Sequence, residues 1–329
     1  MDKLRNSWMA IIAILFCVNL ISCGGSGNEL PDVPTQPNQP NQPTTPKNFE
    51  ISIGFGGEIS VSNSPLGRAI ENDLYAVQVY SKKTSEAAGV YAPYAYGLFD
   101  NTSNLTLNVT EGFTYKFVAS MVVDAKNKIK SEGNKYGVPY SNKTISSDNK
   151  FTISSTIGFD ALGSGTALLA GETSICTMPT LDRFYGEAEL SPSEANKAVT
   201  IHMLRTVFGL KFIAKGVDQE GEVVKIAVEN APAVLTIYYS ANSSEQATDE
   251  IIYTFKDIAA AYASGTSDYT DEITLTITMN NVDVITKDIT VTRNMLSTIT
   301  IHEPNHNGKI NITCEDNAMS EGKDYEIKI

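Results

Sequence analysis

His302 and His306 are the two ends of an H-E-x-x-H pattern, the sequence in which two histidines hold a zinc ion and the glutamate activates water. That chemistry needs both histidines on one face of a helix. Here residues 298–301 alternate as in a strand, and Pro304 inside the motif prevents a helix. The remaining histidine, His202, also lies in a strand-like pattern. We therefore predict no metal site here.

The other patterns that would indicate an enzyme are incomplete. The glycines at residues 54–57 and 163–165 are not followed by the lysine and the helix of a phosphate-binding loop. The chain has 3 histidines and lacks the Gly-x-Ser-x-Gly turn of many serine hydrolases. Its formal net charge of -13 would repel a phosphate backbone, which argues against nucleic acid as a partner. We predict a protein without catalytic residues or a cofactor.

The first residues have the pattern of an export signal. Basic residues precede an apolar run at residues 8–16, which is too short for a membrane span. Residues 20–23 read Leu-Ile-Ser-Cys and resemble the lipobox of bacterial lipoproteins. That resemblance implies removal of residues 1–22 and acylation of Cys23, with palmitate among the chains, which would anchor the protein in the outer membrane. The alternative is an ordinary signal peptide with an incidental cysteine.

A proline-rich linker follows at residues 23–48. From residue 31 to residue 46 every third residue is a proline, with Gln, Asn and Thr between them. Polyproline II has three residues per turn and rises about 3.1 Å per residue, so this run would form a stiff rod of about 50 Å. We predict a spacer that holds the rest of the chain away from a lipid surface.

The stretch that begins at Phe49 has a clear strand pattern. Its apolar residues fall on alternate positions, which gives an extended chain one apolar and one polar face. They are Phe49, Ile51, Ile53, Phe55, Ile59 and Val61. A loop-like run at residues 63–68 ends in Arg68, and another strand pattern begins at Leu74. Cleavage after Arg68 would release one strand and leave an apolar slot, which we predict a strand of another subunit fills.

From Leu74 onward the apolar pattern has period two almost throughout, and only residues 256–263 have a helical pattern. The polar run at residues 189–197 is the best candidate for a boundary between two domains. We therefore predict an all-β protein with two β-sandwich domains in tandem. The expected segments are 1–22 (signal), 23–48 (linker), 49–68 (first strand and propeptide), 69–192 (N-terminal sandwich) and 193–329 (C-terminal sandwich).

Two further features leave alternatives open. Tyr325, Ile327 and Ile329 alternate with charged residues, and they form either the last edge strand of the second domain or a strand donated to a neighbour. Cys176 and Cys314 could form a disulfide in an exported protein, but the sequence does not show whether they are close enough in space.

Taken together, these features resemble the fimbrillin family, the lipoprotein precursors of type V pili. The resemblance rests on the order of five motifs: the lipobox at Cys23, Pro-Leu-Gly-Arg-Ala at residues 65–69, the strand pattern at residues 73–80, Leu-Asp-Arg-Phe-Tyr-Gly at residues 181–186, and the segment at residues 199–208. It implies two transthyretin-like β-sandwich domains. It also implies cleavage between Arg68 and Ala69 by a surface Arg-specific protease, and head-to-tail polymerisation with other fimbrial subunits, serving adhesion.

Two other interpretations remain. The short alternation at residues 325–329 also suits a fimbrial anchor or tip subunit that is not cleaved. The second interpretation is a monomeric surface lipoprotein that binds glycans. Its sugar-stacking residues would be Tyr91, Tyr94, Tyr96 and Phe99.

Overall fold

The structure, a computed structural model, describes residues 45–59, 72–215, 223–232, 234–238, 245–263, 265, 269–279, 283–302 and 311–319. The chain divides into two units, residues 1–45 and 46–329, and every element described below lies in the second unit. Within the described ranges, no helix has the length and the apolar character needed to cross a membrane.

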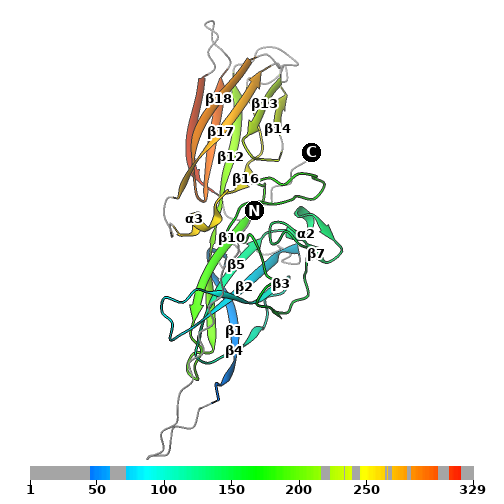
Figure 1. Cartoon of the computed structure of the whole chain (residues 1–329). Coiled ribbons are helices and arrows are strands. Elements are labelled where there is room, and N and C mark those ends of the chain that lie inside the picture. Colours follow the sequence, from blue (N-terminus) through cyan, green and yellow to red (C-terminus); the bar gives the residue numbers. More distant parts are fainter. Residues whose placement is uncertain are drawn as a thin grey trace, which may run out of the picture. The chain divides into compact units, whose positions relative to one another are not determined.

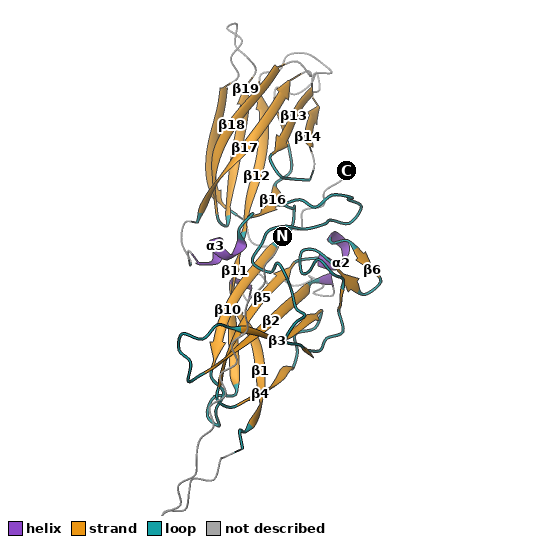
Figure 2. Ribbon diagram, in the orientation of Figure 1, coloured by secondary structure: helices purple, strands orange, loops and turns teal. Residues whose placement is uncertain are grey.

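One eight-stranded sheet contains most of the strands in the N-terminal half of this unit (Figures 1 and 2). In spatial order they are β4 (Leu105–Thr110), β1 (Asn48–Gly57), β11 (Ala198–Arg205), β10 (Arg183–Leu190), β5 (Phe113–Val122), β2 (Leu74–Lys83), β3 (Ala92–Phe99) and β9 (Thr152–Ile153). Neighbouring strands are antiparallel except β1 and β11, which are parallel.

This sheet curls round on itself. The rings of Phe55 on β1 and Tyr75 on β2 lie 5.3 Å apart, although three strands separate β1 from β2 in the sheet. In a flat sheet that separation would be about 19 Å, because neighbouring strands lie about 4.8 Å apart. The hydroxyl of Tyr94 on β3 also donates to the carbonyl of Asn108 on β4 (2.8 Å), which joins strands near opposite edges. One face of the sheet therefore encloses a core.

The other face of β2 and β5 is covered by residues 123–181. This segment contains α2 (Ala125–Lys128) and a small sheet of β6 (Ser131–Glu132), β7 (Lys135–Tyr136) and β8 (Ile145–Ser146). Apolar side chains from both layers form a second core, including Ala76, Val118, Tyr140 and Phe159. Because both faces are covered, burial is unbroken over residues 74–79 of β2 and 117–122 of β5, in place of a simple alternation.

The remaining strands form a sandwich of two sheets. One sheet contains β15 (Glu245–Ala247), β12 (Val207–Lys215), β19 (Met295–His302) and β20 (Asn311–Ala318), with β16 (Ile251–Thr254) also paired to β12. The other contains β14 (Val234–Tyr238), β13 (Val223–Val228), β17 (Thr270–Met279) and β18 (Asp283–Thr292). Alternate side chains of both sheets make one core, among them Phe208, Phe212, Ile226, Leu275 and Ile299.

The described residues are mostly in strands, in several sheets, as the sequence predicts. The helix α3 (Ile258–Ala263) lies inside the predicted range 256–263, whereas the four-residue α2 has no signal in the sequence. The segments 167–169 and 174–178 form no strand and meet only in one isolated bridge, between Ala167 and Cys176. The chain passes from the curled sheet to the sandwich at Thr206, and β11 pairs within the curled sheet.

Candidate functional site

The strand β1 is an interior strand of the curled sheet. It pairs with β4 along one edge, from Asn48 opposite Thr110 to Ile53 opposite Leu105. Along the other edge it pairs with β11, from Ser52 opposite Ala198 to Gly57 opposite Met203. Loss of β1 would therefore expose the backbone groups of two strands at once.

The side chains of β1 confirm the alternation over its first half. Phe49, Ile51 and Ile53 are 5%, 0% and 5% exposed and belong to the core of the curled sheet. Phe55 is half-buried against Tyr75. Burial of each aliphatic or aromatic side chain contributes about 1.5–3 kcal/mol, so the three fully buried residues hold β1 in place mainly by apolar contact.

Gly57 ends the strand. Its φ angle is 80°, in the left-handed region that favours glycine, and a Cβ atom there would lie 2.6 Å from the backbone oxygen of Met203. The strand predicted to continue to Val61 therefore stops at residue 57, although Ile59 is still buried in the same core. Val61 itself lies outside the described residues.

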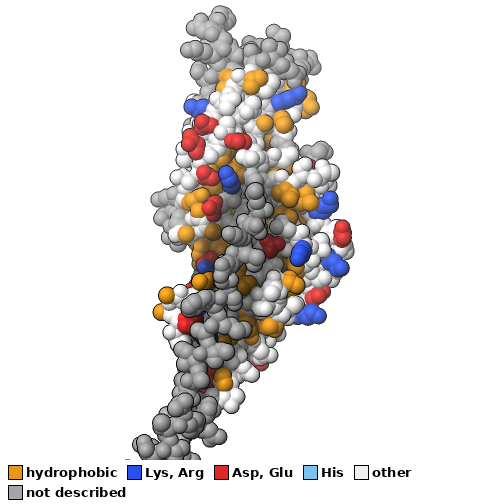
Figure 3. All heavy atoms as spheres, viewed as in Figure 1, with side chains coloured by type: hydrophobic (Ala, Val, Ile, Leu, Met, Phe, Trp, Pro, Cys, Tyr) orange, Lys and Arg blue, Asp and Glu red, His pale blue; other side chains and the backbone are white. Residues whose placement is uncertain are grey.

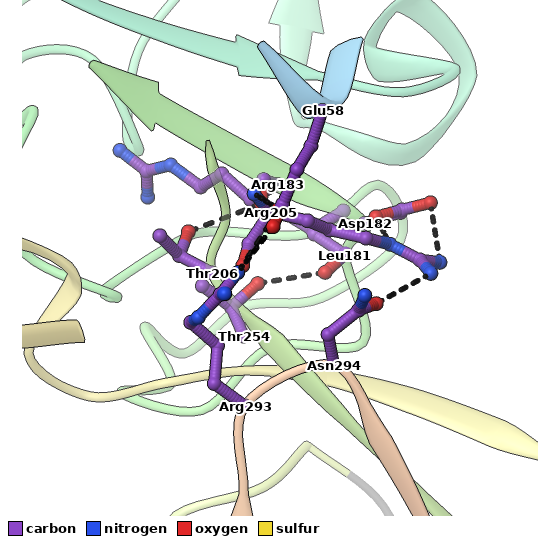
Figure 4. A network of polar contacts seen from close by, with 9 residues as sticks. All are labelled: Glu58, Leu181, Asp182, Arg183, Arg205, Thr206, Thr254, Arg293 and Asn294. Atoms are coloured by element: carbon purple, nitrogen blue, oxygen red, sulfur yellow. Dashed lines mark hydrogen bonds and ion pairs between the residues drawn. The ribbon is translucent and has the colours of Figure 1, made fainter. Parts of the chain in front are cut away.

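The next residue, Glu58, makes a polar contact with the sandwich (Figure 4). Both of its carboxylate oxygens accept hydrogen bonds from Nη1 of Arg293, at 3.1 and 2.9 Å. Oε2 also accepts the backbone N–H of Arg205 at 2.6 Å. The side chain of Arg293 is 4% exposed and that of Glu58 is 31% exposed, so the ion pair is largely shielded from water.

A second ion pair lies beside the first. Arg205 donates from Nε and Nη2 to the two carboxylate oxygens of Asp182, at 2.8 and 2.9 Å, and from Nη1 to the side chain of Asn294 at 3.2 Å. This two-pronged geometry is the strong form of an arginine–carboxylate contact. Arg293 and Asn294 form the turn between β18 and β19, and Asn294 has a φ of 57°. The turn is thus held by residues of the curled sheet.

The passage of the chain at Thr206 is fixed by further hydrogen bonds. The backbone N–H and the hydroxyl of Thr206 donate to the carbonyl of Arg183, at 2.8 and 3.0 Å. The hydroxyl of Thr254 on β16 donates to the carbonyl of Leu181 at 2.8 Å. Figure 4 shows these residues gathered round Glu58 and Arg293. The end of β1 therefore belongs to a network that joins the curled sheet to the sandwich.

Arg183 is fully buried next to this network. It donates to the hydroxyl of Ser120 (2.9 Å) and to the carbonyls of Ser164 (2.9 Å) and Leu162 (3.2 Å). Burial lowers the pKa of Arg183 to about 10, because removal from water disfavours the charged form. Its role in this geometry is to fix residues 162–164 against β10.

Sequence reasoning identified β1 but not the residues at its end. Glu58 and Arg293 are 235 positions apart, and charged residues at a strand end and in a turn are ordinary on any surface. The sequence gives one weak indication of this contact. Arg293 lies in a short turn between two strands with alternating apolar residues, where a long basic side chain is not required to form the turn itself.

Several predicted site residues lie outside the part of the chain that the structure describes. They are Cys23, Val61, Arg68, Ala69, Tyr325, Ile327 and Ile329. Of the two internal cysteines, Cys176 is half-buried and donates its thiol to the carbonyl of Ala167 (3.6 Å), whereas Cys314 lies exposed on β20. Both are present as thiols.

The proposed sugar-stacking aromatics do not form one platform. Tyr94 packs edge-on to Tyr115, Tyr96 packs edge-on to Phe159, and Phe99 is 1% exposed. These three side chains are structural. Tyr91 differs: it lines an open pocket of about 340 Å³ whose wall also includes Tyr80, Lys116, Asp160, Tyr185 and Glu187.

Three polar groups of this pocket are connected to one another. Lys116 contacts Glu187 at 2.6 Å, and the hydroxyl of Tyr185 donates to the same carboxylate at 2.7 Å. Burial and the neighbouring Glu187 raise the pKa of Tyr185 above its ordinary value, which keeps the phenol a hydrogen-bond donor to Glu187. Lys82 lies 4.6 Å from the centre of the Tyr91 ring.

Among the described residues, no group of His, Cys, Asp and Glu side chains is placed to hold a metal ion. His302 lies on β19, and residues 303–306 of the H-E-x-x-H pattern fall outside the described ranges. On the face of the molecule shown in Figure 3, basic and acidic side chains are interspersed.

The comparisons with known proteins give structural likenesses only. No family model and no curated protein matches the sequence. The fimbrial anchor protein Mfa2 from Porphyromonas gingivalis is similar at 10% identity and a TM-score of 0.41, over 84% of this chain and 99% of that chain. A candidate adhesin from Bacteroides thetaiotaomicron has 10% identity and a TM-score of 0.38, over 85% and 100%. The tip fimbrial protein Mfa3 from Porphyromonas gingivalis has 8% identity and a TM-score of 0.33, over 83% and 100%.

The solved structures that this chain is similar to thus include fimbrial proteins.

Proposed function

We propose that this protein is a structural subunit of a cell-surface fimbria whose first strand is replaced by a strand of another subunit. The observation that supports this most is the place of β1, which pairs on both edges and buries Phe49, Ile51 and Ile53. An incoming strand would regain the same backbone hydrogen bonds and fill the same pockets, as in β-strand addition generally.

In this proposal the chain reaches the outer membrane as a lipoprotein acylated at Cys23. A surface protease then cuts between Arg68 and Ala69, and residues 49–68 leave with the N-terminal segment. Residues 325–329 are the candidate donor strand, with Tyr325, Ile327 and Ile329 as the side chains that enter the slot. Both domains would be transthyretin-like sandwiches, and the polymer would serve adhesion without catalysis.

The test is an Arg68→Ala variant in the native cells, with Lys47→Ala as its matched control. Lys47 is an exposed basic residue on the other side of β1, so its loss leaves an Arg-specific cut intact. Electron microscopy should show normal fibres for the control and none for Arg68→Ala, because an uncut chain keeps its own strand in the slot. Fibres of normal length on Arg68→Ala cells would contradict strand replacement and would favour an uncleaved anchor or tip subunit.

The second candidate function is glycan binding at the pocket lined by Tyr80, Tyr91 and Tyr185. Aromatic rings together with carboxylates and a lysine are the groups that stack on and hydrogen-bond to sugars. If this is the function, a Tyr91→Ala variant should lose binding to an oligosaccharide array that the unaltered protein binds, whereas Tyr238→Ala, an exposed tyrosine on β14, should keep it. Equal binding by both variants would exclude the pocket.

A further inference from the structure

The contacts of Glu58 belong to the segment that the proposed cleavage removes. Glu58 follows β1 directly, and its carboxylate accepts from Nη1 of Arg293 and from the backbone N–H of Arg205. Arg293, Arg205 and Asn294 belong to the part of the chain that stays. Departure of β1 therefore takes one carboxylate out of a site whose hydrogen-bond donors remain.

These donors are held in place independently of Glu58. The guanidinium of Arg205 is engaged by both oxygens of Asp182, and Asp182 is thereby committed to Arg205. The backbone N–H of Asn294 donates to the carbonyl of Val207 at 2.7 Å, which fixes the turn that carries Arg293. Nη1 of Arg293 also donates to the carbonyl of Arg205 at 3.0 Å, which aims the guanidinium at the position of the Glu58 carboxylate.

With a strand seated in the slot, as β1 is here, the side chain of Arg293 is 4% exposed, so in the filled slot its poorly hydrated charge favours an anionic partner at short range. Backbone pairing along β4 and β11 would accept many extended segments, because main-chain hydrogen bonds carry little sequence information. Backbone hydrogen bonds alone neither select one strand among many nor fix its register. A charged contact at one end of the slot can do both, because only a strand with a carboxylate at that position satisfies it.

We propose that the slot selects an incoming strand that presents a carboxylate to Arg293 and Arg205, in the place of Glu58. This rests on the proposed function of strand exchange, with a strand of another kind of subunit as the occupant, because residues 325–329 of this chain do not themselves contain the required glycine followed by a carboxylate. The register is set by β1 itself: apolar side chains in the places of Phe49, Ile51 and Ile53, and the acidic residue five positions after the last of them. The residue before the carboxylate is a glycine, because a Cβ atom at Gly57 would lie 2.6 Å from the backbone oxygen of Met203.

The experiment uses the full chain with a site-specific protease sequence at residues 64–68, nicked after purification. Fluorescent peptides of residues 47–59 compete for the slot, and their binding is measured by fluorescence anisotropy. Three peptides are compared: the native sequence, Glu58→Gln, and the matched control Glu50→Gln, which removes an exposed carboxylate from the same strand. The protein itself is unchanged in this comparison, so folding of a variant does not enter.

We expect Glu58→Gln to bind about tenfold or more weakly than the native peptide, and Glu50→Gln to bind within about twofold of it. For a nicked Arg293→Met chain, the dissociation constants of the native and Glu58→Gln peptides should differ by less than about threefold, because the guanidinium that binds the carboxylate is absent. Equal binding of the native and Glu58→Gln peptides would overturn the carboxylate requirement while leaving strand exchange intact. Binding by none of the peptides to the nicked chain would overturn strand exchange, and this inference with it.

Discussion

Replacement of Glu58 by Gln in the intact chain should destabilise the curled sheet more than its surface position suggests. Gln keeps the shape and one acceptor oxygen, so the backbone N–H of Arg205 can still be bound, but the charge opposite Arg293 is lost. Loss of one partner from a fully buried pair costs about 3–5 kcal/mol, whereas an exposed pair contributes about 0–1 kcal/mol. With Arg293 4% exposed and Glu58 31% exposed, the pair lies between these limits, and we expect a loss of about 2 kcal/mol.

Urea unfolding followed by circular dichroism measures this loss, and hydrogen exchange at the Arg205 amide reports it locally. Protection of that amide should fall about 30-fold in Glu58→Gln, since about 2 kcal/mol corresponds to that factor. The control Glu50→Gln should change the unfolding free energy by less than about 0.5 kcal/mol, because Glu50 is exposed on β1. In an Arg293→Met background, the additional cost of Glu58→Gln should fall below about 1 kcal/mol. If Glu58→Gln and Glu50→Gln lower the unfolding free energy by the same amount, the ion pair between Glu58 and Arg293 does not contribute to stability.

Three further substitutions test other parts of the account. Ile51→Ala should lower the unfolding free energy by about 3–4 kcal/mol, because the side chain is fully buried. Its control Ser52→Ala, on the exposed face, should change that free energy by less than about 0.5 kcal/mol, and urea unfolding measures both values. Gly57→Ala should lower the melting temperature more than Gly112→Ala, since both glycines have positive φ but a Cβ atom meets the Met203 oxygen only at residue 57; equal shifts would remove the case for a required glycine. The hydrogen bond from Lys126 lowers the pKa of Asp100, so the ionised carboxylate stabilises the fold above the ordinary carboxyl pKa and this stabilisation is lost as the pH falls through the lowered value. The difference in unfolding free energy between the unaltered chain and Asp100→Asn should therefore shrink from about pH 6 to below about pH 3, and a constant difference would be contrary to the assigned ion pair.

The curled sheet shows what local sequence can and cannot predict. The alternation at Phe49, Ile51 and Ile53 predicts the strand and its buried face, because period two is a property of each strand alone. The apolar pattern runs on to Ile59 and predicts a longer strand, but the backbone at Gly57 turns to a φ of 80° and β1 ends there. Glu58 contacts a turn that is 235 positions away in the sequence. Only the tertiary fold brings the two together, so the local sequence around Glu58 does not predict the contact.

The place where the chain changes sheets shows the same limit. The polar run at residues 189–197 has the composition of a domain boundary, but in the structure it is the connection between two antiparallel neighbours, β10 and β11. The chain moves from β11 to β12, and so from one sheet to another, at Thr206, a buried threonine inside an otherwise continuous strand pattern without a glycine, a proline or a charge cluster. Composition detects exposed turns, and this passage is not exposed.

Mass spectrometry of subunits taken from assembled surface material is the most direct test of the central claim, that β1 is exchanged for a strand of another chain. We predict an N-terminus at Ala69 and no peptides from residues 48–57 in that material, with full recovery of peptides from residues 72–215. Recovery of peptides from residues 48–57 in equal amount, on subunits still acylated at Cys23, would contradict the exchange.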